Sequence, residues 1–157
     1  MPYKLPFSIQ VVIFAPTVDP IPYLLLKRIA AHGGFWQTVT GSLEVDETPR
    51  RAAVREVFEE TGIVCRADDL LDLELTNVFE IAPLWRSKFA PEVTHNEEVC
   101  FALGVEIGTV RLDASEHDDY EWVDYETALQ MLYWESSKKA LAKTRELANR
   151  GFANDAL

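Results

Sequence analysis

The sequence has few of the residues that build disulfide frameworks or zinc sites. Its two cysteines, Cys65 and Cys100, lie far apart and belong to no CxxC or Cys/His pattern, which favours buried free thiols. The three histidines, His32, His95 and His117, lack the spacing of a zinc site. No G-x-S-x-G motif is present, so the sequence gives no sign of a serine nucleophile.

Positive charge is also scarce in this sequence. It contains 15 Lys and Arg against 26 Asp and Glu, which gives a formal net charge of -11. Because affinity for nucleic-acid phosphates depends on neutralisation by Lys and Arg, this balance argues against a surface that binds duplex nucleic acid. It is compatible with a small phosphorylated substrate that is held through metal ions.

Long apolar runs are missing as well. The run FSIQVVIFA, residues 7–15, is short, is interrupted by Gln10 and has no basic leader, so it predicts a strand and not a signal peptide. We therefore expect a cytoplasmic protein without a membrane segment. With 157 residues and no low-complexity linker or repeat, the chain is predicted to form one domain, residues 1–157, around one core.

What the sequence does contain is an alternation of strand-like and helix-like segments. Residues 7–14 and 23–28 predict neighbouring strands, joined by the turn-prone stretch PTVDPIP. Further strands are predicted at 35–41, 72–81 and 97–107, and a C-terminal helix at 125–150. Strands that flank two helices indicate an α/β sandwich.

The first predicted helix has strong signals at both ends. Thr48 is a suitable N-cap, Pro49 fits the first helical position, and Gly62 marks the end. At about 100° per residue, its apolar side chains share a face that we expect to dock on the sheet. These side chains are Ala53, Val54, Val57 and Phe58.

Three glutamates, Glu56, Glu59 and Glu60, gather on the adjoining face, where we expect them to point outward together. This arrangement is locally unfavourable, because like charges at i, i+4 repel and acids in a last turn oppose the helix dipole. A solvated acidic face is one interpretation. A site for Mg²⁺ is the other, since this cation takes a few carboxylates together with waters and substrate phosphates.

The spacing around these glutamates is specific. Gly41 is followed after five residues by Glu47, and after seven more by REVFEETGI at 55–63. Over its 23 residues this segment resembles the Nudix box at every defined position. The resemblance implies an α/β/α sandwich with a mixed sheet. It also implies an enzyme that hydrolyses a nucleoside diphosphate linked to another group.

The resemblance further implies roles for individual residues, with Arg55 pairing with Glu47 to fix the loop before the helix. The implied catalytic set is Glu47, Arg55, Glu56, Glu59 and Glu60, and the implied ligands of Mg²⁺ or Mn²⁺ are Glu56, Glu59, Glu60 and the carbonyl of Gly41. Metal ions that bridge a pyrophosphate neutralise developing charge and orient a water for in-line attack. The general base stays open between Glu59, Glu116 and an acid of residues 92–98.

Three stretches resemble one branch of the family, the dihydroneopterin triphosphate pyrophosphatases. They are FWQTVTGSLE (35–44), VFEI (78–81) and FAPEVTHNEE (89–98), and the similarity covers nearly the whole chain. By this match, Glu116 adds a metal ligand. The implied substrate contacts are Lys4, Arg28, Thr40, Phe79, Glu80, Ile81 and Ala82. Glu80 or backbone carbonyls would accept the ring N–H and the amine of a pterin, and Phe79 would stack on the ring.

The sequence departs from this branch at three places. Asp46 stands where Gly is frequent, residues 29–34 differ in length and charge, and YWESS at 133–137 differs at an implied contact. Nudix enzymes that act on 8-oxo-dGTP, dATP, dinucleoside polyphosphates or capped RNA would share every catalytic residue and differ only in the pocket. A Nudix-fold binding module without catalysis would normally have a broken box, whereas this box is complete.

Overall fold

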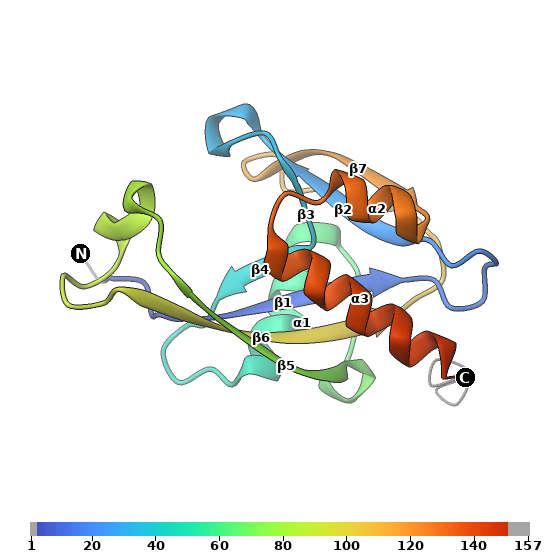
Figure 1. The fold of residues 1–157 in the computed structure, drawn as a ribbon, viewed down its shortest axis with the longest axis horizontal. Coiled ribbons are helices and arrows are strands. Elements are labelled where there is room, and N and C mark those ends of the chain that lie inside the picture. The colour runs from blue at the N-terminus through green and yellow to red at the C-terminus, as the bar shows by residue number, and fades with distance from the viewer. Residues whose placement is uncertain (1–2, 151–157) are drawn as a thin grey trace.

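A computed structural model describes residues 3–150 of the chain (Figure 1). Short 3-10 helices are labelled η. Along the chain the elements are β1 (Phe7–Phe14), β2 (Tyr23–Arg28), η1 (Ala30–His32), β3 (Trp36–Gln37), β4 (Val39–Ser42), α1 (Pro49–Thr61), η2 (Ala67–Asp69), β5 (Leu71–Glu80), η3 (Pro83–Lys88), β6 (His95–Gly104), β7 (His117–Val123), α2 (Tyr125–Met131) and α3 (Glu135–Asn149). No helix in the described residues combines the length and the apolar composition that crossing a membrane requires.

The strands form one mixed, seven-stranded sheet. Its main order is β3-β2-β1-β6-β5, while β4 pairs with β1 and β7 pairs with β2. β1 runs parallel to β6, and the other paired strands are antiparallel. β1 is therefore the strand around which the rest of the sheet is organised.

β1 divides one of its edges between two partners. Phe14, at its end, pairs with Tyr23 of β2, whereas residues 8–11 pair with β4. β2 and β4 therefore diverge along the same edge of β1, and the sheet opens between them. The chain crosses this opening at Thr38, between β3 and β4.

Helices cover both faces of the sheet, which confirms the predicted α/β/α sandwich. α1 packs on the face to which Ile9, Val11 and Ile13 of β1 point, and α2 and α3 pack on the face of Val12 and Phe14. In Figure 1, α3 crosses in front of the sheet and α1 lies behind it. Because strand side chains alternate, odd residues of β1 reach the α1 layer and even residues reach the α3 layer.

The strands agree with the sequence in part. β1 and β2 lie where they are predicted and are paired. The strand predicted at 35–41 is instead two strands, because the chain changes partner at Thr38, from β2 to β1. The strand predicted at 97–107 begins earlier and ends at Gly104. β7 has no predicted counterpart, since its sequence HDDYEWV is mostly polar and partly exposed.

The helix predicted at 125–150 is interrupted at residues 132–134. Leu132 has an extended backbone and forms a bridge with Trp36 of β3, and the Tyr133 N–H donates to the Trp36 carbonyl at 3.3 Å. No glycine or proline marks the break. It comes from pairing with a strand about 96 residues earlier in the chain, which is a tertiary override of local propensity.

Candidate active site

α1 begins and ends at the residues that the sequence signals. The hydroxyl of Thr48 accepts a hydrogen bond from the Arg51 backbone N–H at 3.2 Å, and Gly62 is left-handed with a φ of 77°. The N–H of Gly62 donates to the carbonyl of Phe58. These caps fix the extent of α1 and so the position of its acidic residues. The side chains that α1 buries are Ala52, Ala53, Val57, Glu60 and Thr61.

Two side chains of α1 differ from their predicted faces. Phe58 is predicted to dock on the sheet but is 46% exposed, and the guanidinium of Arg111 lies 5.5 Å from its ring centroid. Glu60 is predicted to point outward but is only 7% exposed. The buried face is centred on Ala53, Val57 and Glu60, at i, i+4 and i+7, and Phe58 lies about 100° away from Val57 around the helix.

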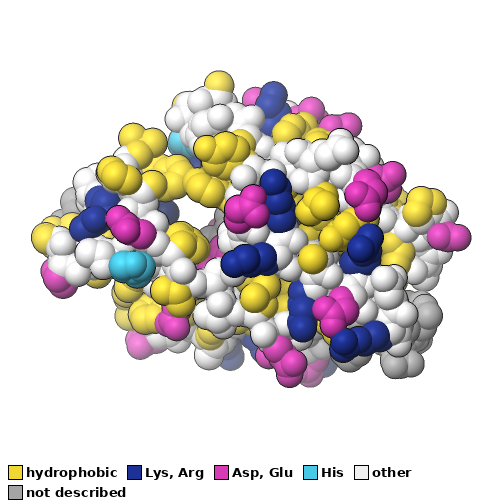
Figure 2. Space-filling view, viewed as in Figure 1, with side chains coloured by type: hydrophobic (Ala, Val, Ile, Leu, Met, Phe, Trp, Pro, Cys, Tyr) yellow, Lys and Arg dark blue, Asp and Glu magenta, His cyan; other side chains and the backbone are white. Residues whose placement is uncertain are grey.

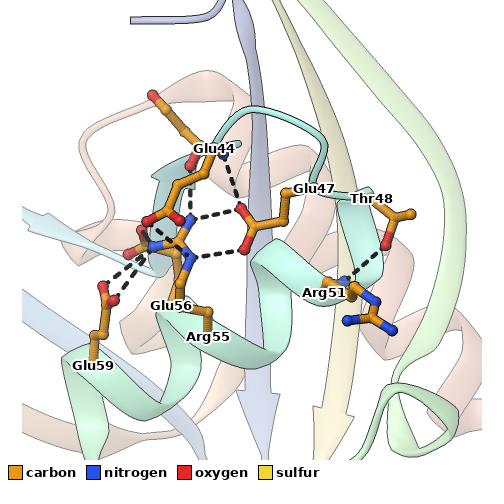
Figure 3. Close-up of polar contacts among 8 residues, drawn as sticks. Glu44, Glu47, Thr48, Arg51, Arg55, Glu56 and Glu59 are labelled. Carbon is orange, nitrogen blue, oxygen red and sulfur yellow. Dashed lines mark hydrogen bonds and ion pairs between the residues drawn. The ribbon is translucent and has the colours of Figure 1, made fainter.

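Arg55 is the centre of an ion-pair network in front of α1 (Figure 3). Its Nε and Nη2 donate to the two carboxylate oxygens of Glu47 at 2.8 and 2.9 Å. Its Nη1 donates to Glu56 at 2.7 Å and lies 3.3 Å from Glu59, while Nη2 also donates to the carbonyl of Ser42 at 3.0 Å. The hydrogen bonds from Arg55 lower the pKa of Glu47. The bidentate pair therefore ties the loop before α1 to the helix.

Glu56 and Glu60 form a largely buried carboxyl pair. Burial raises the pKa of Glu60 well above its usual value, and the adjacent Glu56 raises it further. Burial also raises the pKa of Glu56, although hydrogen bonds with Glu60 and Arg55 oppose that shift. Oε1 of Glu60 is buried and has no hydrogen-bond partner among the described residues. Such a pair is unfavourable when both groups are ionised, and a cation beside it would remove the penalty.

Basic side chains share the surface around this acidic pair. Nη2 of Arg28 lies 3.7 Å from Oε2 of Glu116, and the buried Nε of Arg28 has no hydrogen-bond partner within residues 3–150. The backbone N–H of Lys4 donates to the Lys88 carbonyl at 2.9 Å. Partial burial and then Lys88 lower the pKa of Lys4, whereas Glu116 and Glu56 raise it. No local sequence pattern indicates Lys88, because its place depends on pairing between distant segments.

The remaining predicted metal ligands are more exposed. Glu59 is half-exposed and pairs with Arg55, and Glu116 is partly exposed and lies 3.7 Å from Nδ1 of His32. In the part of the chain that the structure describes, no three acidic, histidine or cysteine side chains already form a cluster for a metal ion. The donors still fit a hard divalent cation, because the unpaired Glu60 oxygen and its neighbours are carboxylates.

The predicted pterin residues lie on two different faces of the sheet. Thr40 of β4 is paired with Gln10, and Phe79 of β5 is paired with Asn96, so both project toward the α3 side. Glu80 follows Phe79 on the same strand and therefore projects from the opposite face, where it is exposed. One ring cannot stack on Phe79 and also meet the carboxylate of Glu80 in the predicted way.

Ile81 and Ala82 form the turn from β5 into η3. Ile81 is buried, and its N–H donates to the Thr94 carbonyl at 2.9 Å. Ala82 is the N-cap residue of η3 and is partly buried. These two residues shape the backbone beside Phe79 and bring no polar side chain to it.

A buried polar network beneath α3 escaped the sequence reasoning. The amide nitrogens of Gln10 and Asn77 donate to the same oxygen, Oε1 of Glu98, at 2.9 and 3.2 Å. The Thr38 hydroxyl donates to Oε1 of Gln10 at 2.7 Å. The one signal in the sequence was Gln10 itself, a polar residue inside an otherwise apolar buried strand.

Comparison with known proteins agrees with this fold. The profile of the NUDIX domain matches residues 5–144. The chain is 37% identical over 145 residues to the dihydroneopterin triphosphate diphosphatase of Haemophilus influenzae, covering 91% of this chain and 89% of that protein. It is 38% identical over 141 residues to the protein of the same name from Escherichia coli K12, covering 88% and 91%. The structure of the Escherichia coli dihydroneopterin triphosphate pyrophosphohydrolase matches with a TM-score of 0.79 at 37% identity, covering 91% and 97%.

The chain therefore belongs to the Nudix hydrolase family. The resemblance noted in the sequence is confirmed, and the mixed α/β fold is that of Nudix structures. Enzymes of this family are diphosphatases that act on small phosphorylated substrates and generally use divalent metals.

Proposed function

We propose that this Nudix hydrolase cleaves dihydroneopterin triphosphate to the monophosphate and pyrophosphate, a step of folate biosynthesis. The two relatives at 37% and 38% identity carry that activity in their names, and each is matched over about nine-tenths of its length. The observation that carries most weight is that the buried Glu56 and Glu60 pair shares one surface with Lys4 and Arg28. A triphosphate that is bound through a cation needs carboxylates to hold the cation and basic side chains to meet the remaining phosphate oxygens.

In this proposal the carboxylates of Glu56 and Glu60 hold Mg²⁺ or Mn²⁺, with Glu59, Glu116 and the Gly41 carbonyl as further donors. The bound cation supplies charge neutralisation on the pyrophosphate and activation of a water. Burial of Glu60 keeps bulk water away from this donor, which strengthens its interaction with a cation.

The other residues of the site act on the substrate or on the donors. Lys4 and Arg28 meet phosphate oxygens, since both side chains are only partly buried and carry N–H donors. Arg55 holds Glu56 and Glu47 in place without contact to the substrate. Glu59 and Glu116 are accessible carboxylates next to this set, and in this proposal one of them accepts the proton of the attacking water.

The proposal is tested by substrate preference. With Mg²⁺ present, we expect a higher kcat/KM for dihydroneopterin triphosphate than for GTP or dATP, and pyrophosphate as the inorganic product. The reason is that the flexible side chain of dihydroneopterin has no ribose ring, so a pocket shaped for it is a poorer fit for nucleotides. A clear preference for a nucleotide, or release of single phosphates, would leave the family assignment but reject this substrate.

A further inference from the structure

The polar network beneath α3 lies beside the predicted pterin residues. Glu98 of β6 is opposite Asn77 of β5, and the next pair on this face toward the end of β5 is Asn96 with Phe79. Directly opposite residues in an antiparallel pair have their side chains on the same face. Glu98 therefore shares a face with Phe79, which is 41% exposed. Its neighbour Glu97 projects to the other side and is exposed.

A hollow opens on this face of the molecule. Figure 2 shows it between the part of the chain that carries η3 and the start of α3, with hydrophobic side chains along its rim. Aromatic side chains connect the two sides, because the ring centroids of Trp85 in η3 and Trp134 before α3 are 5.9 Å apart. Phe35 lies 5.3 Å from Trp134, edge to face. A flat ring has both space and aromatic surface here.

The hollow is close to the phosphate side of the site. Ser8 of β1 is paired with Glu98 on one side and with Ser42 of β4 on the other. Two strand spacings of about 4.8 Å place Glu98 about 10 Å from β4. Gly41 of β4 touches Glu56. A ring joined to its phosphates by a short carbon chain spans a distance of this order.

Only one of the two carboxylate oxygens of Glu98 accepts hydrogen bonds from the described residues. It is only 5% exposed, yet both amide donors of the network, from Gln10 and Asn77, go to Oε1. Oε2 receives no side-chain or backbone donor within residues 3–150 and is not fully enclosed. A buried carboxylate that keeps an open acceptor next to an aromatic hollow is suited to a ligand with N–H donors.

We propose that Glu98 is the residue that selects the ring of the substrate: its Oε2 accepts hydrogen bonds from the ring N–H and exocyclic amine, while Gln10 and Asn77 position the carboxylate. This assigns to Glu98 the role that the sequence suggested for Glu80. The inference deepens the proposed function and rests on it for the pterin ring. The recognition itself applies to any ring with this donor edge, including guanine.

The test compares two rings that have the donor edge, dihydroneopterin triphosphate and dGTP, with one that lacks it, dATP. In the Glu98→Gln variant, Gln10 and Asn77 keep the amide oxygen at the Oε1 position, so the amide nitrogen takes the place of Oε2. The amide N–H groups, which are hydrogen-bond donors, then face the ring N–H and exocyclic amine, which are donors as well. We expect kcat/KM to fall by about 10- to 100-fold for the first two substrates and by no more than about twofold for dATP. The control is Glu106→Gln, an exposed carboxylate just beyond the other end of β6, which should change none of them.

The outcomes separate this inference from the proposed function. Equal loss on all three substrates, or no loss on any, overturns the role of Glu98. Selective loss on the donor-edge substrates by an enzyme that prefers dGTP supports Glu98 and rejects the pterin substrate. If thermal melting shows that Glu98→Gln is unfolded, the wild-type enzyme decides: neopterin should inhibit at least tenfold better than its analogue with a dimethylated exocyclic amine, and equal inhibition would overturn the inference.

Discussion

The backbone of Gly41 and the carboxyl group of Glu56 occupy adjoining space. A Cβ atom at residue 41 would lie 2.1 Å from Cδ and 2.4 Å from Oε1 of Glu56. Glycine is required here by the contact and not by the backbone, whose φ is not in the left-handed region. The absence of a side chain at Gly41 of β4 therefore leaves the space that the carboxyl group of Glu56 on α1 occupies.

Gly41→Ala is expected to displace the Glu56 carboxylate. Because that group is the end of a flexible side chain, it can rotate away, and the melting temperature should change little. Misplacing a catalytic group by about 1 Å lowers rates by on the order of 100-fold, so kcat should fall by that amount. Gly108→Ala is the control, since nothing lies within 4 Å of its Cβ position. A Gly41→Ala enzyme with normal kcat would show that the position of Glu56 is unimportant.

Glu60→Gln should separate activity from stability. The substitution removes a buried, partly unsatisfied carboxyl group, so in the presence of chelator the variant should melt at or above the wild-type temperature. Its kcat with Mg²⁺ should fall by about 10²- to 10⁴-fold, and the rise in melting temperature that Mg²⁺ gives the wild type should shrink. Glu121→Gln, an exposed site on β7, is the control. Full wild-type turnover in excess chelator would contradict a metal role for Glu60.

Arg55→Ala should affect kcat more than KM. Arg55 lies on α1 and holds Glu47, Glu56 and Glu59 through hydrogen bonds and ion pairs. Its loss should therefore misplace these acids without removing a substrate contact. Arg51→Ala, one turn earlier on the exposed side of α1, should leave both constants unchanged. A defect of Arg55→Ala that lay wholly in KM would place this side chain on the substrate instead.

The contribution of Glu98 to the free energy of unfolding should fall as the pH rises. Burial raises the pKa of Glu98 above its usual value, so the folded state binds its proton more tightly than the unfolded state does. This contribution is fully present below the unfolded pKa of about 4.5 and is lost as the pH rises through the folded pKa. In urea titrations from pH 4 to 8, Glu98→Gln should therefore lose stability less steeply than the wild type. Parallel curves for the two proteins would contradict the shift.

The sequence predicted best what depends on neighbouring residues. The caps of α1 and the pairing of Arg55 with Glu47 involve residues close together in the chain, and both are present in the structure. Asp46, just before Glu47, has a φ of 65°, which lies in the left-handed region that favours glycine. Periodicity identified the apolar face of α1 but not its rotation, so Phe58 was misplaced.

What the sequence did not predict depends on distant contacts. The approach of Lys88 to Lys4 follows from a bridge between segments about 84 residues apart, and the Gln10 to Glu98 hydrogen bond joins residues 88 apart. No local pattern encodes such pairs. The face on which Glu80 projects depends on the register of β5 against β6, which the sequence of β5 alone does not set.

In the proposed mode of binding, the split edge of β1 lets the substrate extend through the sheet instead of lying along one side of it. The phosphates would then meet the α1 layer and the ring the α3 layer, and the adjacent residues Thr40 and Gly41 face opposite layers. Mutations that retune the ring pocket therefore need not touch the hydrolytic machinery. Substrate preference can therefore change through substitutions on the α3 face of the sheet while the residues of α1 and the loop before it stay the same.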